Sequence, residues 1–95
     1  MPSTTMLNRF YYIYVLESKV DSHRYIGFSS DLRKRLEEHN SGKSFATRPR
    51  RPLSLIYYEA CLTESDAHRR ERYFKQTGGR RFLAKRLKDY YHSTL

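Results

Sequence analysis

The chain has 95 residues, enough for one domain and too few for two separate hydrophobic cores. With 38% hydrophobic and 31% charged residues it is too apolar to be disordered, and no apolar run approaches the ~20 residues that a membrane span requires. The 19 Lys and Arg exceed the 10 Asp and Glu to give a net charge of +9, which favours a polyanionic partner, most often nucleic acid.

The N-terminal part of the chain predicts a β-hairpin. Residues 1–9 are polar and without periodicity, so we expect a flexible leader, followed by a single domain over 10–91 and a short tail at 92–95. Aromatic and β-branched residues predict strands over 10–17 and 24–28. The short polar segment between them indicates that the two strands pair in antiparallel fashion.

A helix and a third strand follow the hairpin. Ser30 is a suitable N-cap, and Asp31 would lie in the first turn of a helix over 31–39, where the helix dipole favours an acidic side chain. Residues 42–52 begin with glycine, end with proline and contain four basic residues and no acidic one, so we expect a basic loop there. Residues 53–59 are again aromatic and aliphatic and predict a strand.

Two helices are predicted after the third strand. Thr63 resembles the start of a capping box and would begin a helix over about residues 63–76, which Gly78 and Gly79 would end. Leucine and tyrosine at helical spacing predict another helix over 80–91. The resulting order, β-β-α-β-α-α, indicates an α+β protein with a small sheet covered by helices.

The first predicted helix carries polar residues on the side that should be buried. Leu32 and Leu36 mark its apolar stripe, and at 100° per residue His39 falls within about 20° of Leu32 and Arg35 within about 60°. We therefore expect Arg35 and His39 on or beside the face that docks on the sheet. Burying an arginine there is costly without an anionic partner.

The second helix shows a similar feature. Ala67 and Phe74 mark its inward stripe, and Glu71 falls about 40° from Ala67, so its carboxylate should point toward the sheet. A purely structural interpretation also exists, in which Glu71 forms a salt bridge with Arg35 or Arg70 and the histidine is an ordinary core residue.

Together with Tyr14 and Tyr25 on the hairpin, these groups have the chemistry for phosphodiester hydrolysis. A carboxylate can hold a divalent cation, a guanidinium can stabilise negative charge on a phosphate, and phenol or imidazole groups can transfer protons. We therefore treat Tyr14, Tyr25, Arg35, His39 and Glu71 as candidate site residues.

The order and spacing of these elements resemble the GIY-YIG nuclease superfamily. The first motif corresponds to residues 12–14 (Tyr-Ile-Tyr), the second to 25–27 (Tyr-Ile-Gly), and the resemblance extends through Glu71 to about Leu87. The chain is most similar to small stand-alone bacterial members related to the N-terminal nuclease domain of excinuclease C. The resemblance implies a three-stranded antiparallel sheet flanked by helices, and metal-dependent cleavage of DNA.

The resemblance also implies residue roles. Tyr14 matches the tyrosine proposed to act as general base or to position the attacking water, and Tyr25 matches the tyrosine near the scissile phosphate. His39 matches the histidine that relays a proton. Gly27 matches the motif glycine, at which a side chain would crowd the site.

Two further roles concern charge. Arg35 matches the arginine that stabilises the transition state, and Glu71 matches the carboxylate that alone holds a single Mg²⁺ or Mn²⁺. The chain departs from the family pattern in two places: Tyr12 replaces the glycine of the first motif, and no asparagine follows Asn40, whereas many members have one in the site.

The basic residues of the loop and of the C-terminal half should contact a phosphate backbone. A solvated helix face is the alternative explanation for such a charge run. The candidates are Lys43, Arg48, Arg50, Arg51, Arg69, Arg72, Lys75, Arg80 and Arg81. Phosphate contacts do not read sequence, and no base-reading motif is recognisable, so we expect weakly specific or structure-directed action on duplex or branched DNA. A DNA repair or recombination role and a protein partner that supplies specificity are compatible with this expectation.

Other interpretations remain open from the sequence. The chain could be a non-catalytic module that binds DNA or RNA through the same basic face. We expect His23, His68 and His92 to be exposed to solvent, without a shared site. Cys61 is the single cysteine, so an internal disulfide is excluded, which agrees with a cytoplasmic protein, and we expect a structural role for it.

Overall fold

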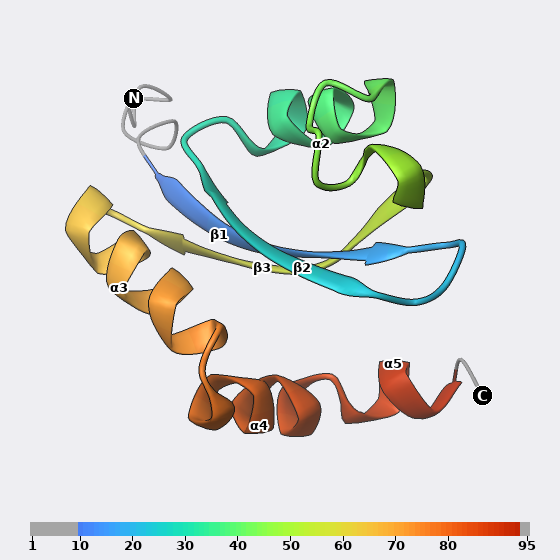
Figure 1. Ribbon diagram of the computed structural model, residues 1–95. Helices are drawn as coiled ribbons and strands as arrows, with labels where there is room; N and C mark the ends of the chain where they lie inside the picture. Colours follow the sequence, from blue (N-terminus) through green and yellow to red (C-terminus); the bar gives the residue numbers. More distant parts are fainter. Residues whose placement is uncertain (1–9, 94–95) are drawn as a thin grey trace, which may run out of the picture.

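The computed structural model, which describes residues 10–93, is a three-stranded antiparallel sheet with helices on both faces (Figure 1). This confirms the predicted α+β class. The elements in chain order are β1 (Tyr11–Ser18), β2 (Arg24–Ser29), α2 (Leu32–Ser41), the short 3-10 helix η1 (Arg48–Arg50), β3 (Leu53–Cys61), α3 (Glu64–Phe74), α4 (Thr77–Arg86) and α5 (Lys88–Ser93). The leader predicted for residues 1–9 lies outside the described residues.

The central strand of the sheet is β1, because the strand order is β2-β1-β3. Residues 13–18 of β1 are all buried, as expected of a strand with neighbours on both sides and helices on both faces. Tyr14 pairs with Gly27 on one side and with Tyr58 on the other, and Leu16 pairs with Tyr25. The two edge strands, β2 and β3, are only partly buried. The outer edge of β2 is therefore open to form a site.

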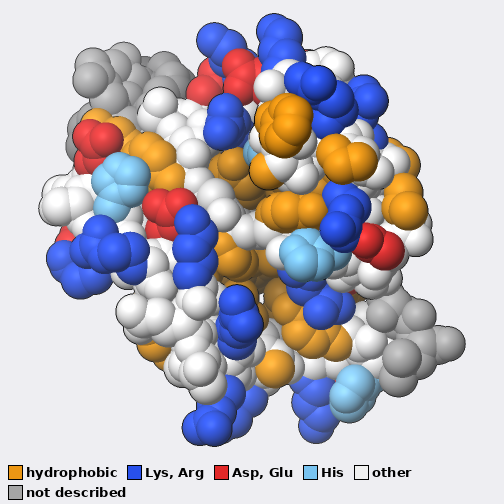
Figure 2. Space-filling model, in the orientation of Figure 1, with side chains coloured by type: hydrophobic (Ala, Val, Ile, Leu, Met, Phe, Trp, Pro, Cys, Tyr) orange, Lys and Arg blue, Asp and Glu red, His pale blue; other side chains and the backbone are white. Residues whose placement is uncertain are grey.

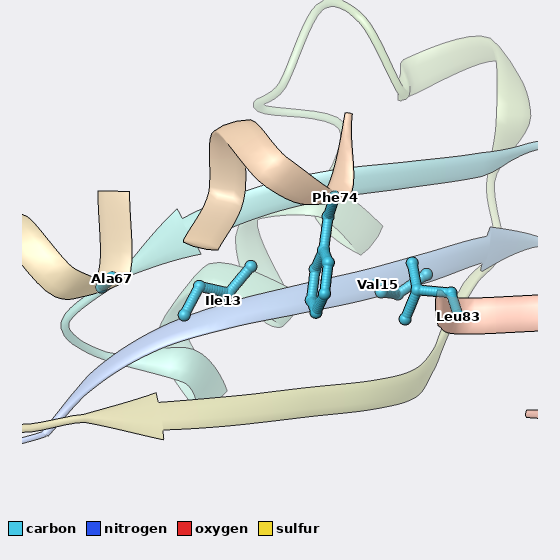
Figure 3. Packing of buried hydrophobic residues seen from close by; sticks show 5 residues of the cluster. All are labelled: Ile13, Val15, Ala67, Phe74 and Leu83. Carbon is cyan, nitrogen blue, oxygen red and sulfur yellow. The ribbon is translucent and has the colours of Figure 1, made fainter. Parts of the chain in front are cut away.

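Alternate residues of β1 build two separate cores. One face of the sheet packs against α3 and α4 through the buried residues in Figure 3, namely Ile13, Val15, Ala67, Phe74 and Leu83. The opposite face packs against α2. Its buried members are Tyr14, Leu16 and Leu53, with Leu32 and Leu36 of α2 against them. The helical periodicity indicated which side of each helix is buried, but not which face of the sheet the helix covers. The structure places α2 and α3 on opposite faces (Figure 1).

Helix α2 begins one residue later than predicted. Asp31, and not Ser30, is the N-cap: its backbone is extended (φ −140°, ψ 91°) and its carboxylate accepts a hydrogen bond from the Lys34 amide at 3.1 Å. An aspartate is as good a cap as a serine, so the sequence alone did not distinguish the two. At the other end of the helix, Gly42 is the C-cap and adopts the left-handed conformation with φ 88°, which is typical of glycine at this position.

The prediction that Gly78 and Gly79 end a helix was wrong. Helix α3 ends at Phe74, and both glycines lie inside the first turn of α4. A Cβ on Gly79 would lie 2.0 Å from the Tyr73 carbonyl oxygen, so the glycine lets α4 approach the end of α3. The single helix predicted over 80–91 is also two helices, separated at Leu87.

Helix α5 is fixed to the hairpin through a buried carboxylate. The Tyr90 hydroxyl donates to Glu17 Oε1 at 2.5 Å, and Arg24 Nε donates to Glu17 Oε2 at 3.1 Å. The hydrogen bond to Glu17 raises the pKa of Tyr90. Helix α5 continues through Ser93, two residues into the segment expected as a tail. None of the helices within residues 10–93 is long and apolar enough to span a membrane.

The two adjacent glycines of α4 provide a matched test of this packing. We expect Gly79→Ala to destabilise the fold by about 1–3 kcal/mol, because the new methyl group meets backbone atoms of Tyr73 and Phe74. Gly78→Ala should be neutral or stabilise by up to about 1 kcal/mol, because the nearest heavy atom there is a Tyr73 ring carbon at 3.4 Å. Urea unfolding of both variants measures the difference, and equal stabilities would contradict the packing described.

Candidate active site

A pocket of about 360 Å³ lies at the open edge of β2. Its walls come from both sides of the sheet and from the loop after α2. All five candidate chemical groups line it together with the motif glycine. The lining residues with a polar function or a motif position are Tyr14, Tyr25, Gly27, Arg35, His39, Ser44, Thr47, His68 and Glu71. The five groups proposed from the sequence therefore line one pocket, and their roles stay predictions.

The hydroxyl of Tyr14 is the centre of a buried hydrogen-bond network. It lies 3.0 Å from His39 Nε2, and it accepts a hydrogen bond from Arg35 Nε at 3.3 Å. Tyr14 and His39 are almost completely buried, whereas Arg35 is exposed and also pairs with Glu38 at 3.2 Å. The hydrogen bond to Tyr14 raises the pKa of Arg35. A cation is thus held against the phenol oxygen.

Gly27 makes room for this network. It is the β2 partner of Tyr14, and a Cβ at residue 27 would lie 2.3 Å from both Cζ and Oη of the Tyr14 ring. Real side-chain contacts are never that close, so any larger residue would displace the ring. The motif glycine is therefore required by the position of the Tyr14 hydroxyl.

His39 is held from its other side by Thr47, a residue that was not among the predicted site residues. Nδ1 of His39 lies 2.8 Å from Oγ1 of Thr47, and Thr47 is 1% exposed. Burial, followed by the nearby charge of Arg35, lowers the pKa of His39, so the ring is neutral at pH 7. Because Tyr14 accepts from Arg35, its own proton is free to point at Nε2. With that proton shared with Nε2, we assign the proton of the neutral ring to Nδ1, from which it is donated to Thr47.

Glu71 enters the pocket from α3, on the other face of the sheet. Its Oε1 lies 3.3 Å from His68 Nδ1, and its Oε2 lies 3.2 Å from Lys75 Nζ. The salt bridges considered from the sequence are absent within residues 10–93, because Arg35 pairs with Glu38 and Arg70 pairs with Glu59 at 2.8 Å. The carboxylate side chain is 18% exposed and so remains accessible from the pocket.

The expectation that His68 has no partners was wrong. Its ring stacks on Phe28 of β2 with centroids 4.0 Å apart, and it contacts both Glu64 and Glu71. The sequence contained one signal for this role, since His68 precedes Glu71 by three residues and the two must share a helix face. On the helical wheel His68 lies about 100° from Ala67, which favours exposure to solvent. Because the edge of β2 is open, however, this side of α3 lines the pocket.

The pocket offers one carboxylate, that of Glu71, to a hydrated divalent ion. No group of three or more His, Cys, Asp or Glu side chains that could enclose a metal occurs in the described part of the chain. Mg²⁺ is commonly held by one or two carboxylates plus waters and substrate oxygens, and Glu71 offers one such carboxylate. An ion on Oε2 has to displace the ammonium of Lys75, which is 54% exposed and on a flexible stem. The donor set is thus compatible with the predicted Mg²⁺ or Mn²⁺.

The predicted phosphate-binding residues divide into two groups. Arg50, Arg69 and Lys75 form ion pairs with Asp21, Asp66 and Glu71, and Arg48 and Arg51 donate to backbone carbonyls of the loop. The other four are exposed and have no ion pair with any residue in 10–93, namely Lys43, Arg72, Arg80 and Arg81. Figure 2 shows Lys and Arg side chains over much of one face, with few carboxylates between them.

A larger depression, of about 750 Å³, lies between α2 and β3. Tyr12 and Tyr58 form its wall, and its one carboxylate, Asp31, is occupied as the cap of α2. Tyr12, which stands where the first motif usually has glycine, therefore lines this depression and not the candidate active site. The side chains with candidate catalytic or metal-binding roles line the pocket of about 360 Å³ and not this depression.

The lowered pKa of His39 predicts acid sensitivity. The unfolded chain binds a proton at this histidine near its ordinary pKa of 6.5, whereas the folded protein does so only at lower pH. Stability should therefore be complete above about pH 6.5 and fall below it, by at most about 1.4 kcal/mol per pH unit. His39→Gln should be less stable at pH 7.5 but lose less between pH 7.5 and 5.5. Urea unfolding at the two pH values tests this, and an identical loss in both proteins would contradict it.

Comparison with known proteins identifies the family of the chain. The chain is 46% identical over 66 residues to a UPF0213 protein of Bacillus pumilus (strain SAFR-032), covering 68% of this chain and 66%, just under two thirds, of that protein. It is 47% identical over 66 residues to a UPF0213 protein of Streptococcus pyogenes serotype M3, covering 68% of this chain and 71% of that protein. No solved structure matches with significance. Residues 10–88 match the GIY-YIG catalytic domain, and the chain therefore belongs to the GIY-YIG family, a family of nucleases.

Proposed function

We propose that this protein is a divalent-metal-dependent endonuclease that hydrolyses phosphodiester bonds in DNA. The observation that carries the proposal is the contact of the Tyr14 hydroxyl with both a neutral imidazole and a guanidinium, in the pocket that Glu71 also lines. A proton acceptor, a fixed cation and a metal-binding carboxylate are the groups that phosphodiester hydrolysis needs. The GIY-YIG family assignment supports the same chemistry.

Tyr14 and His39 would activate the attacking water. As the water oxygen forms its bond to phosphorus, its proton moves to the Tyr14 oxygen, and the phenol proton moves to His39 Nε2 at 3.0 Å. The bond between phosphorus and the leaving 3′-oxygen breaks in the same displacement, and solvent protonates that oxygen. His39 can accept a proton only when it is neutral, which its lowered pKa ensures at pH 7.

Arg35, Tyr25 and Glu71 would bind the phosphate group. Arg35 donates its Nε proton to Tyr14, and its exposed terminal nitrogens can reach non-bridging oxygens where negative charge develops. Tyr25 lines the same pocket and can donate to the phosphate. Glu71 would hold one Mg²⁺ or Mn²⁺ through a carboxylate oxygen and waters. When bound, such an ion supplies Lewis-acid stabilisation of the phosphate and the leaving oxygen.

The exposed cations that have no acidic partner in the described part of the chain would supply sequence-independent affinity. Lys43, Arg72, Arg80 and Arg81 are exposed and have no acidic partner within the described residues, so each is available for a phosphate oxygen. Contacts of this kind position DNA without reading its bases. We therefore propose weakly specific or structure-directed cleavage, with a partner protein or a branched substrate as the source of any specificity in repair or recombination.

The metal ligand provides the first test. Glu71→Gln keeps the size of the side chain but removes its charge, and should lower Mg²⁺-dependent nicking of supercoiled DNA by at least about a hundredfold. Glu37→Gln is the matched control, because Glu37 is exposed on α2 outside the pocket and should leave nicking unchanged. Gel analysis of nicked plasmid, beside thermal melts, measures both.

Two results would contradict the proposal in different ways. Full nicking by Glu71→Gln would exclude the role of this carboxylate. Salt-sensitive DNA binding without cleavage by the unmodified protein, in either Mg²⁺ or Mn²⁺, would instead support the non-catalytic binding module.

Thr47 provides a second test, as a positioning residue for His39. Thr47→Val preserves the shape but removes the oxygen that holds Nδ1, and should reduce kcat about ten- to a hundredfold while KM stays nearly constant. Thr47→Ser retains the oxygen and should restore most of the activity. If the serine and valine variants are equally impaired, packing and not the hydrogen bond is what Thr47 contributes.

A further inference from the structure

A second pocket, of about 570 Å³, adjoins the candidate active site along β2. We call it the β2–α4 pocket. Its floor is formed by the buried side chains of Val15, Phe74 and Leu83, and its rim by Arg24, Arg80 and Tyr91. Tyr25 and Ile26 line both pockets, so the two adjoin along β2. Its volume is within the range of about 300–1,000 Å³ that is usual for sites that bind small organic groups.

The rim presents planar groups that are fixed in place. The guanidinium carbon of Arg24 lies 3.8 Å above the centroid of the Tyr91 ring. Arg24 is itself held against the buried carboxylate of Glu17, to whose Oε2 it donates a hydrogen bond from Nε at 3.1 Å and forms an ion pair through Nη2 at 3.0 Å. The rings of His23 and Tyr25, which also line the pocket, have centroids 4.8 Å apart. Aromatic rings and guanidinium planes of this kind are the surfaces on which unpaired nucleobases stack.

The charge of the pocket selects an anion. Arg24, Arg80 and Lys75 line it together with His23, and none of its lining residues within the described part of the chain is Asp or Glu. Arg24 and Lys75 already contact carboxylates, whereas Arg80 is exposed and forms no ion pair with any residue in 10–93. An apolar floor, planar walls and an uncompensated guanidinium match one ligand class, a nucleotide.

The distance to the candidate active site sets the position of that nucleotide. Arg24 and Gly27 are three residues apart on β2, which corresponds to about 10 Å at ~3.3 Å per residue. One strand of stacked DNA advances ~3.4 Å per nucleotide, and an unstacked strand advances further, so the pocket lies within about three nucleotides of the bond to be cleaved. Bases inside a duplex offer only their edges to a protein, and a base must leave the stack to place its face in a pocket.

We propose that the β2–α4 pocket binds an unpaired nucleotide of the DNA strand, within about three nucleotides of the cleaved bond, with its phosphate on Arg80 and its base against the Arg24–Tyr91 stack. This inference rests on the proposed function and defines its substrate as DNA with a single-stranded arm beside the cleavage position. The polarity of the arm is an outcome of the test.

The test compares the affinity for three labelled DNAs of equal nucleotide number: a full duplex, and two shorter duplexes that carry a 5′ or a 3′ single-stranded arm. Fluorescence anisotropy in EDTA measures binding without cleavage. We expect the full chain to bind one armed DNA at least about fivefold more tightly than the duplex, as stacking of one base provides. Arg80→Gln and Tyr91→Leu should each reduce this ratio at least about threefold. Arg33→Gln removes the same charge on α2, outside the β2–α4 pocket, and should leave the ratio unchanged.

The outcomes separate this inference from the nuclease proposal. Equal binding of all three DNAs by the unmodified protein, or a preference that Arg80→Gln retains, would overturn the assignment of the pocket even if cleavage occurs. A preference that both variants lose would support the assignment even if no DNA is cleaved. Because Arg80 is exposed, its variant should keep the melting temperature and give a readable result if Tyr91→Leu affects folding.

Discussion

The hydroxyl of Tyr14 has to occupy the space that a side chain at residue 27 would fill, and the rest of the site depends on this constraint. With glycine at that position, the phenol lies against the β2 backbone and reaches both His39 and Arg35 of α2. The same ring belongs to the core beneath α2, so the chemical group and the packing group are one residue. A change at Gly27 would therefore disturb the core and the hydrogen-bond network together.

The open edge of β2 explains how groups from opposite faces of a sheet share a pocket. Arg35 and His39 come from α2 on one face, and His68 and Glu71 come from α3 on the other. An unpaired edge strand is normally a liability, because it can pair with another chain. Here β2 is short, and helices and a basic loop surround it. These elements cover the edge, and side chains from the helices on the two faces of the sheet meet there.

Several errors of the sequence-based predictions have a common origin in tertiary packing. Gly78 and Gly79 are weak helix formers, yet they lie in α4 because Gly79 allows its backbone to touch that of Tyr73. His68 is well off the apolar stripe of α3, yet Phe28 at the sheet edge provides a ring for it to stack on. In both cases the local preference was real but smaller than the energy of a contact with a residue on another element.

The sequence by itself determined the strands, the inward sides of α2 and α3 and the set of candidate groups, because side-chain period and motif spacing are local properties of the chain. It also identified Gly27, through the family resemblance. Only the tertiary structure decided that α2 and α3 cover opposite faces, that Thr47 and His68 support His39 and Glu71, and that a second basic pocket adjoins the first. These features depend on which residues meet across the sheet, and the sequence pattern of one element carries no information about the partner that another element brings to it.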